Sequence, residues 1–149
     1  MKIPYFKQGV DWTCGAASMR MVLASFGIRK SEKEIVGMLG TNKTRGTKNK
    51  AFSALAEKLK LSYAVKRNSS LVDLKFFLGR GYKIIICYFI LEEKTGHYAV
   101  VSKISRDKIH LLDPIYGEEH TLSLKEFVKI WKNNPKYDNE KGWFIGIKK

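Results

Sequence analysis

The sequence has only two cysteines and three prolines, and it has no apolar segment long enough to cross a bilayer. A transmembrane helix needs about 20 consecutive apolar residues. The opening segment "MKIPYFKQ" also lacks the apolar core of a secretory signal. We therefore expect a cytoplasmic domain, with no membrane span in this chain.

The scarcity of cysteine limits the chemistry as well. Cys14 and Cys87 are far apart in the sequence and form no CxxC pair, so neither a disulfide framework nor a cysteine-rich zinc site is indicated. No His-x-x-x-His spacing is present either. Cys87, within "KIIICYF", has the surroundings of a buried strand residue. We expect no metal and no other cofactor.

Acidic residues are also few. The chain has 28 Lys and Arg against 14 Asp and Glu, a net charge of +14, which attracts nucleic acid, anionic membrane surfaces or acidic peptides. The densest basic segment, "TNKTRGTKNK" (41–50), has no interleaved aromatic residues and no recognition motif accompanies it. We therefore expect a solvated basic loop there and no nucleic-acid partner.

The remaining composition is that of a globular domain. Of the 149 residues, 44% are hydrophobic and 28% are charged, and we find no internal repeat or linker. A chain of this length can bury its own core. We expect a single domain over residues 1–149.

The first half of the chain shows helical patterns. Residues 14–26, "CGAASMRMVLASF", are apolar on almost all sides, which predicts a buried helix ending near Gly27. Two capping-box patterns, Ser31 with Glu34 and Ser70 with Asp73, indicate the starts of two further helices. Another helix is expected to begin after Thr47.

The second half shows strand patterns. The expected strands cover residues 82–90, 97–104, 108–113 and 142–147, with a helix after Ser123 and Glu126. Residues 97–104 and 108–113 are close enough to form a hairpin. Helices first and an antiparallel sheet second predict an α+β fold, with the opening helix packed on the sheet.

Cys14 stands at the start of the buried helix. The unpaired N–H groups of a helix N-terminus carry a partial positive charge and favour a thiolate. Gly15 leaves the space beside the sulfur free of a side chain. At this point a small buried structural cysteine explains the position equally well.

Histidine and aspartate in the second half favour the reactive interpretation. His97 follows Gly96 at the start of a strand, and Asp113 ends the next strand before Pro114. If the two strands are neighbours, the carboxylate can orient the imidazole and stabilise its charged form, and the imidazole can activate Cys14. His110 and His120 are expected to be structural or surface residues.

Gln8 precedes Cys14 by six residues. Its neutral amide can donate a hydrogen bond to the oxyanion of a tetrahedral intermediate, beside the backbone N–H of Cys14. A carboxylate at this place would repel the developing charge. Without the other residues, an exposed polar side chain would explain Gln8 equally well.

Four segments in order resemble the double-glycine leader peptidases that process bacteriocins, a papain-like family of cysteine peptidases. They are "PYFKQGVDWTCGAASMRMVLASFG", "GTKNKAFSALAEKLKL", "GHYAVV" and "LLDPIYG". The resemblance implies a papain-like fold, with Cys14 as the nucleophile, His97 as the general base and acid, Asp113 as the orienting residue and Gln8 as the oxyanion donor.

The resemblance also implies a function. Members of this family cleave leader peptides after Gly-Gly and commonly head an ABC exporter, which would place the domain at the cytoplasmic face of the membrane. This chain contains no phosphate-binding GxxxxGK[ST] loop, so such a transporter would lie outside it. Two alternatives share the fold: a catalytically idle peptide-binding domain, and another thiol acyl-transfer enzyme of transglutaminase or amidase type.

Overall fold

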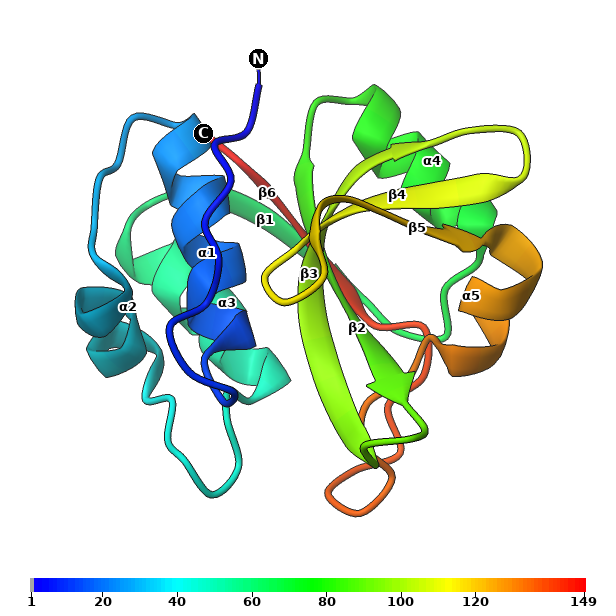
Figure 1. Ribbon diagram of the computed structural model, residues 1–149. Coiled ribbons are helices and arrows are strands. Elements are labelled where there is room, and N and C mark those ends of the chain that lie inside the picture. Colours follow the sequence, from blue (N-terminus) through cyan, green and yellow to red (C-terminus); the bar gives the residue numbers. More distant parts are fainter. Residues whose placement is uncertain (1) are drawn as a thin grey trace.

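A computed structural model describes residues 2–149 and shows helices on both faces of one antiparallel sheet (Figure 1). The six strands lie in the order β1-β6-β2-β3-β4-β5. In chain order the elements are α1 (Cys14–Ser25), α2 (Glu32–Leu39), α3 (Asn49–Lys58), β1 (Ser62–Lys66), α4 (Leu71–Gly79), β2 (Lys83–Ile90), β3 (Thr95–Ile104), β4 (Lys108–Asp113), β5 (Gly117–Ser123), α5 (Leu124–Ile130) and β6 (Phe144–Lys148).

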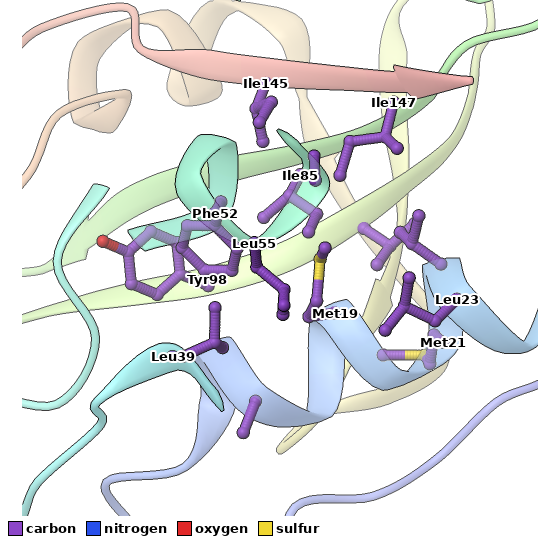
Figure 2. Packing of buried hydrophobic residues seen from close by; sticks show 14 of the residues in the cluster. Met19, Met21, Leu23, Leu39, Phe52, Leu55, Ile85, Tyr98, Ile145 and Ile147 are labelled. Carbon is purple, nitrogen blue, oxygen red and sulfur yellow. The ribbon is translucent and has the colours of Figure 1, made fainter. Parts of the chain in front are cut away.

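The first hydrophobic core lies between the N-terminal helices and one face of the sheet (Figure 2). Met19 and Leu23 of α1 are fully buried, as is Phe52 of α3. They belong to the same cluster as Ile85 of β2 and Ile145 of β6. Burying apolar area at roughly 25 cal/mol per Å² makes this layer a main source of stability, and it fixes α1 against the sheet.

The second core covers the opposite face. Leu74 of α4 and Phe127 of α5 are fully buried against the sheet residues Ile84, Ile86 and Leu111. Alternate residues of β2 therefore serve the two cores, because successive strand side chains point to opposite faces. This explains why the segment is a continuous apolar run.

The predicted α+β architecture is confirmed, including the packing of the opening helix on the sheet. The Ser31 hydroxyl accepts the Glu34 N–H at 3.1 Å, and Glu34 accepts the Ser31 N–H at 3.0 Å, as the capping box predicts. The hairpin of β3 and β4 is present, with an irregularity between Val101 and Lys103.

Two strands were not predicted. β1 and β5 lie at the two edges of the sheet, and their side chains are largely exposed or half-buried. A strand with little apolar area on either face has no clear alternating pattern, so its residues do not predict a strand. Among residues 2–149, no helix is long and apolar enough to cross a membrane.

Candidate active site

The N-terminus of α1 has neither a side-chain cap nor an acidic residue, so it can interact with a negatively charged group. Cys14 is the first residue of the helix, and the side chain of the preceding Thr13 does not cap it. Instead, the Thr13 hydroxyl donates to the Val10 carbonyl oxygen at 2.9 Å. The first turn contains no acidic residue, whereas α2 carries Glu32 and Glu34 there. The unpaired N–H groups at Cys14 thus remain free to favour a thiolate or an oxyanion.

The Cys14 side chain, 9% exposed, lies between α1 and β3. The backbone N–H of Tyr98 donates to its sulfur at 3.5 Å. The His97 side chain lies next to the same sulfur, and Cys14 favours the charged form of the imidazole. A donated hydrogen bond stabilises a thiolate more than a thiol, so the Tyr98 N–H and the imidazole are placed to support the nucleophilic form of the sulfur.

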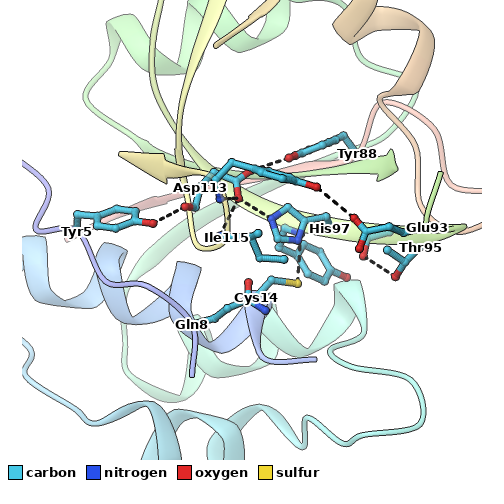
Figure 3. Close-up of polar contacts among 12 residues, drawn as sticks. Tyr5, Gln8, Cys14, Tyr88, Glu93, Thr95, His97, Asp113 and Ile115 are labelled. Atoms are coloured by element: carbon cyan, nitrogen blue, oxygen red, sulfur yellow. Dashed lines mark hydrogen bonds and ion pairs between the residues drawn. The ribbon is translucent and has the colours of Figure 1, made fainter. Parts of the chain in front are cut away.

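His97 joins the sulfur to a buried carboxylate. Its Nε2 atom lies 2.8 Å from Oδ1 of Asp113, which leaves Nδ1 for the contact with Cys14 (Figure 3). Burial disfavours the imidazolium, but the Cys14 sulfur and the Asp113 carboxylate outweigh it and raise the pKa of His97 to about 10. A charged imidazolium between two anionic partners is the state in which the thiol is activated.

Asp113 is fully buried and is held by four donors. Oδ1 accepts from His97 and from the backbone N–H groups of Ile115 and Tyr116, at 2.9 and 3.0 Å, while Oδ2 accepts from the Tyr88 hydroxyl at 2.6 Å. Burial raises the pKa of Asp113, but the hydrogen bond and charge of His97 and the Tyr88 hydroxyl outweigh it, so the pKa is lowered overall. The carboxylate is ionised at neutral pH.

Gln8 lies next to the turn that leads into α1. Its backbone N–H donates to the Pro114 carbonyl oxygen at 3.1 Å, and its side-chain Nε2 donates to the Val10 carbonyl oxygen at 2.7 Å. The side chain is buried, and its Oε1 has no hydrogen-bond partner in the described part of the chain. One N–H of the amide is engaged with Val10, and the second is available to another acceptor.

Gly15 has a different role from the one expected. A Cβ atom at this position would lie 2.5 Å from Oγ1 and 2.7 Å from Cβ of Thr47, and 3.2 Å from Phe52. The absence of a side chain therefore serves close packing of α1 against the segment before α3, rather than clearing space at the sulfur.

A cleft of about 380 Å³ opens beside Cys14. It lies between two segments, residues 43–49, which lead into the start of α3, and residues 133–138 before β6; Gly96 and Tyr98 also line it. The two segments touch each other: Arg45 pairs with Asp138 at 3.7 Å, and the Tyr137 hydroxyl donates to the Thr44 carbonyl oxygen at 3.4 Å.

The other two histidines are separate from this arrangement. His110 Nε2 lies 3.0 Å from the Ser105 hydroxyl, and His120 packs against the ring of Tyr116. Within residues 2–149, no three His, Cys, Asp or Glu side chains gather in a geometry that could hold a metal ion. Tyr88 and the 133–138 segment were not predicted as part of the site, because nothing in an apolar strand or a polar loop marks such distant contacts.

Comparison with solved structures supports the fold. A double glycine motif protease from an AMS/PCAT transporter, solved with its leader peptide, superposes with a TM-score of 0.77 at 20% identity, over 99% of this chain and 91% of that one. The peptidase domain of Streptococcus ComA gives a TM-score of 0.76 at 19% identity, covering 99% and 98%. A putative C39-like peptidase from Bacillus anthracis gives 0.75 at 13% identity, covering 99% and 94%.

Sequence comparison identifies the family. The chain is 29% identical over 129 residues to the lactococcin-A transport/processing ATP-binding protein LcnC of Lactococcus lactis subsp. lactis. This match covers 85% of the chain but only 17% of LcnC, so the chain spans about a sixth of that relative. The model of the Peptidase C39 family matches residues 2–135. The chain therefore belongs to the Peptidase C39 family of cysteine peptidases.

Proposed function

We propose that this peptidase cleaves leader peptides after small residues of Gly-Gly type, with Cys14, His97, Asp113 and Gln8 as its catalytic residues. The observation that carries the proposal is the continuous contact from Cys14 through His97 to Asp113 at an uncapped helix start. Each residue is buried, and each contact favours the thiolate–imidazolium pair that peptide-bond cleavage requires.

The reaction begins with attack of the Cys14 thiolate on the carbonyl carbon of the scissile bond. The oxyanion that forms lies at the start of α1, where the Cys14 N–H and the free N–H of Gln8 can donate to it. His97 then gives its proton to the leaving amine, and the thioester remains on Cys14. Water, deprotonated by His97, hydrolyses the thioester and releases the peptide.

The form of the cleft supports a preference for small residues. Arg45 and Asp138 connect its two walls, and so do Tyr137 and Thr44. Gly96, which also lines the cleft, packs so closely against the protein that a Cβ atom there would come within 3.2 Å of the Asn134 nitrogen and 3.3 Å of the Cys87 sulfur. The cleft walls are therefore held by contacts within the protein, and we infer that a peptide segment with small side chains passes between them most easily.

LcnC carries a transport function in its name, and the AMS/PCAT protease was solved with a leader peptide. By analogy, we infer that this domain works with an ABC transporter outside this chain, at the cytoplasmic face of the membrane. The net charge of +14 is consistent with a position next to anionic lipid or with an acidic peptide substrate.

A peptide panel tests the proposal. The protein is incubated with leader-like peptides that carry Gly-Gly, Ala-Ala or Val-Val before the cut, and the products are identified by mass spectrometry. We expect cleavage after Gly-Gly, weaker cleavage after Ala-Ala and none after Val-Val, with all activity lost in Cys14→Ala. Cleavage that ignores the residues before the cut would contradict the specificity. An absence of cleavage together with normal alkylation of Cys14 would contradict the peptidase assignment for these substrates and favour another acyl transfer.

A further inference from the structure

Tyr88 lies in the middle of the apolar strand β2, yet it ends in a polar contact. Its side chain is 3% exposed, and its hydroxyl donates to Oδ2 of Asp113 at 2.6 Å (Figure 3). In the sheet register Tyr88 stands directly opposite His97 of β3, and the two rings meet edge to face with centroids 5.4 Å apart. Three neighbouring strands, β2, β3 and β4, thus contribute Tyr88, His97 and Asp113 to one hydrogen-bonded group.

The two oxygens of Asp113 have different partners. Oδ1 accepts from His97 and from two backbone N–H groups, whereas Tyr88 is the donor to Oδ2. Asp113 is fully buried, so without Tyr88 one of its oxygens would be out of contact with water and without this donor. A buried anionic oxygen without a partner is costly, and a carboxyl group in that situation takes up a proton.

We propose that Tyr88 is a positioning residue of the active site: its hydroxyl holds Oδ2 of Asp113 and so keeps Oδ1 ionised and directed at His97. The role rests on the proposed function, since it acts through His97 on Cys14. Tyr88 itself touches neither the sulfur nor the cleft.

The hydroxyl is suited to this role at every working pH. Burial raises the pKa of Tyr88 far above its ordinary value, and the neighbouring Asp113 carboxylate raises it further, so the group stays protonated and always donates. Unlike a histidine or lysine in the same place, it brings no charge that would compete with His97 for the carboxylate.

Replacing Tyr88 by Phe removes the hydroxyl and keeps the ring. The pKa of Asp113 should then rise, so that activity is lost at a higher pH on the acid side. A hydrogen bond to a charged group corresponds to a shift of about one to two pH units. We expect kcat to fall about tenfold with little change in KM, because Tyr88 acts on the chemical step and not on substrate contact.

Tyr63 offers a matched control. It is also a tyrosine in the sheet whose hydroxyl donates to a carboxylate, Glu57 at 3.2 Å, but it lies on the edge strand β1 and is exposed. Tyr63→Phe should leave both kcat and the pH profile unchanged. If Tyr88→Phe lowers kcat but leaves the acid limb of the profile where it is in the wild type, the residue is merely structural and the proposal is wrong.

A second measurement does not depend on peptide cleavage. The rate of Cys14 alkylation at pH 6 is compared among the wild type, Tyr88→Phe, Asp113→Asn and the double variant. Because Tyr88 acts through Asp113, its substitution should slow alkylation in the wild type and have no further effect in Asp113→Asn. Additive effects would overturn the proposal. A failure of the proposed function would show instead as absent peptide cleavage in the wild type, with this cycle intact.

Should Tyr88→Phe fail to fold, 3-fluorotyrosine placed at position 88 alone keeps the hydroxyl and makes it a stronger donor. The acid limb should then move to lower pH. An unchanged acid limb would count against the proposal.

Discussion

The packing of α1 at Gly15 gives a specific prediction, because the side chain of Thr47 lies closer to this position than any other group. In Gly15→Ala the new methyl group would meet Thr47 at 2.5 Å (Oγ1) and 2.7 Å (Cβ). Thr47 cannot easily withdraw, since its hydroxyl lies 2.7 Å from that of Thr41 and its carbonyl oxygen lies 2.9 Å from the Tyr98 hydroxyl. The helix start must therefore shift away from α3.

Overpacking of this kind costs about 1–3 kcal/mol of unfolding free energy. The shift would also move Cys14 relative to His97, and a displacement of about 1 Å in a catalytic group can lower the rate about 100-fold. We therefore expect Gly15→Ala to lower both the denaturation midpoint in urea and the rate of peptide cleavage.

Gly37 supplies the control within the same chain. It lies inside α2, where a Cβ atom would meet nothing within 4 Å. Gly37→Ala should raise the unfolding free energy by about 0.5–1 kcal/mol, because alanine favours a helix interior. A Gly15→Ala protein as stable and active as Gly37→Ala would refute the reasoning from packing.

The remaining predictions concern the charges and hydrogen bonds around the site. Asn133 and Asn49 exchange two amide hydrogen bonds, of 3.1 and 2.9 Å, beside the cleft, and Asn49 Oδ1 also accepts from the Tyr98 hydroxyl at 2.6 Å. Asn133→Ala should therefore cost about 1–3 kcal/mol in a urea titration, because the buried Nδ2 of Asn49 loses its acceptor; an unchanged midpoint would contradict this. The lowered pKa of Asp113 stabilises the fold above the ordinary value of 3.8, and this contribution is lost as pH falls through the folded value, so Asp113→Asn should flatten the acid loss of stability; a curve parallel to the wild type would contradict it. On the alkaline side, cleavage should decline near pH 10, where His97 loses the proton that it gives to the leaving amine; a decline centred near pH 6.5 would contradict the ion pair.

The parts of the fold that sequence reasoning could reach were those with strong local patterns. A short local pattern was enough to predict three features: the buried helix at residues 14–26, the capping box at Ser31 and the apolar run of β2. β1 and β5 did not, because edge strands bury little and their pairing partners lie elsewhere in the chain.

The site follows the same division. The proximity of His97 and Asp113 could be predicted from the hairpin that joins their strands. The contact of Tyr88 with Asp113 and the pairing of Arg45 with Asp138 could not, because they join segments whose neighbourhood depends on the whole sheet. Gly15 shows a further limit of prediction from sequence. A need for the absence of a side chain could be inferred there, but only the fold shows that the neighbour requiring it is Thr47.

The central claim, that Cys14 is a nucleophile activated by His97, is tested most directly by the pH dependence of its alkylation. Cys87→Ala removes the second, buried thiol, and the modified residue is mapped by mass spectrometry. The account predicts fast labelling of Cys14 already below pH 7, because the His97 imidazolium stabilises the thiolate. It also predicts a marked loss of this labelling in His97→Ala. A rate that rises only near the ordinary thiol titration at about pH 8.5, and is the same in His97→Ala, would contradict it.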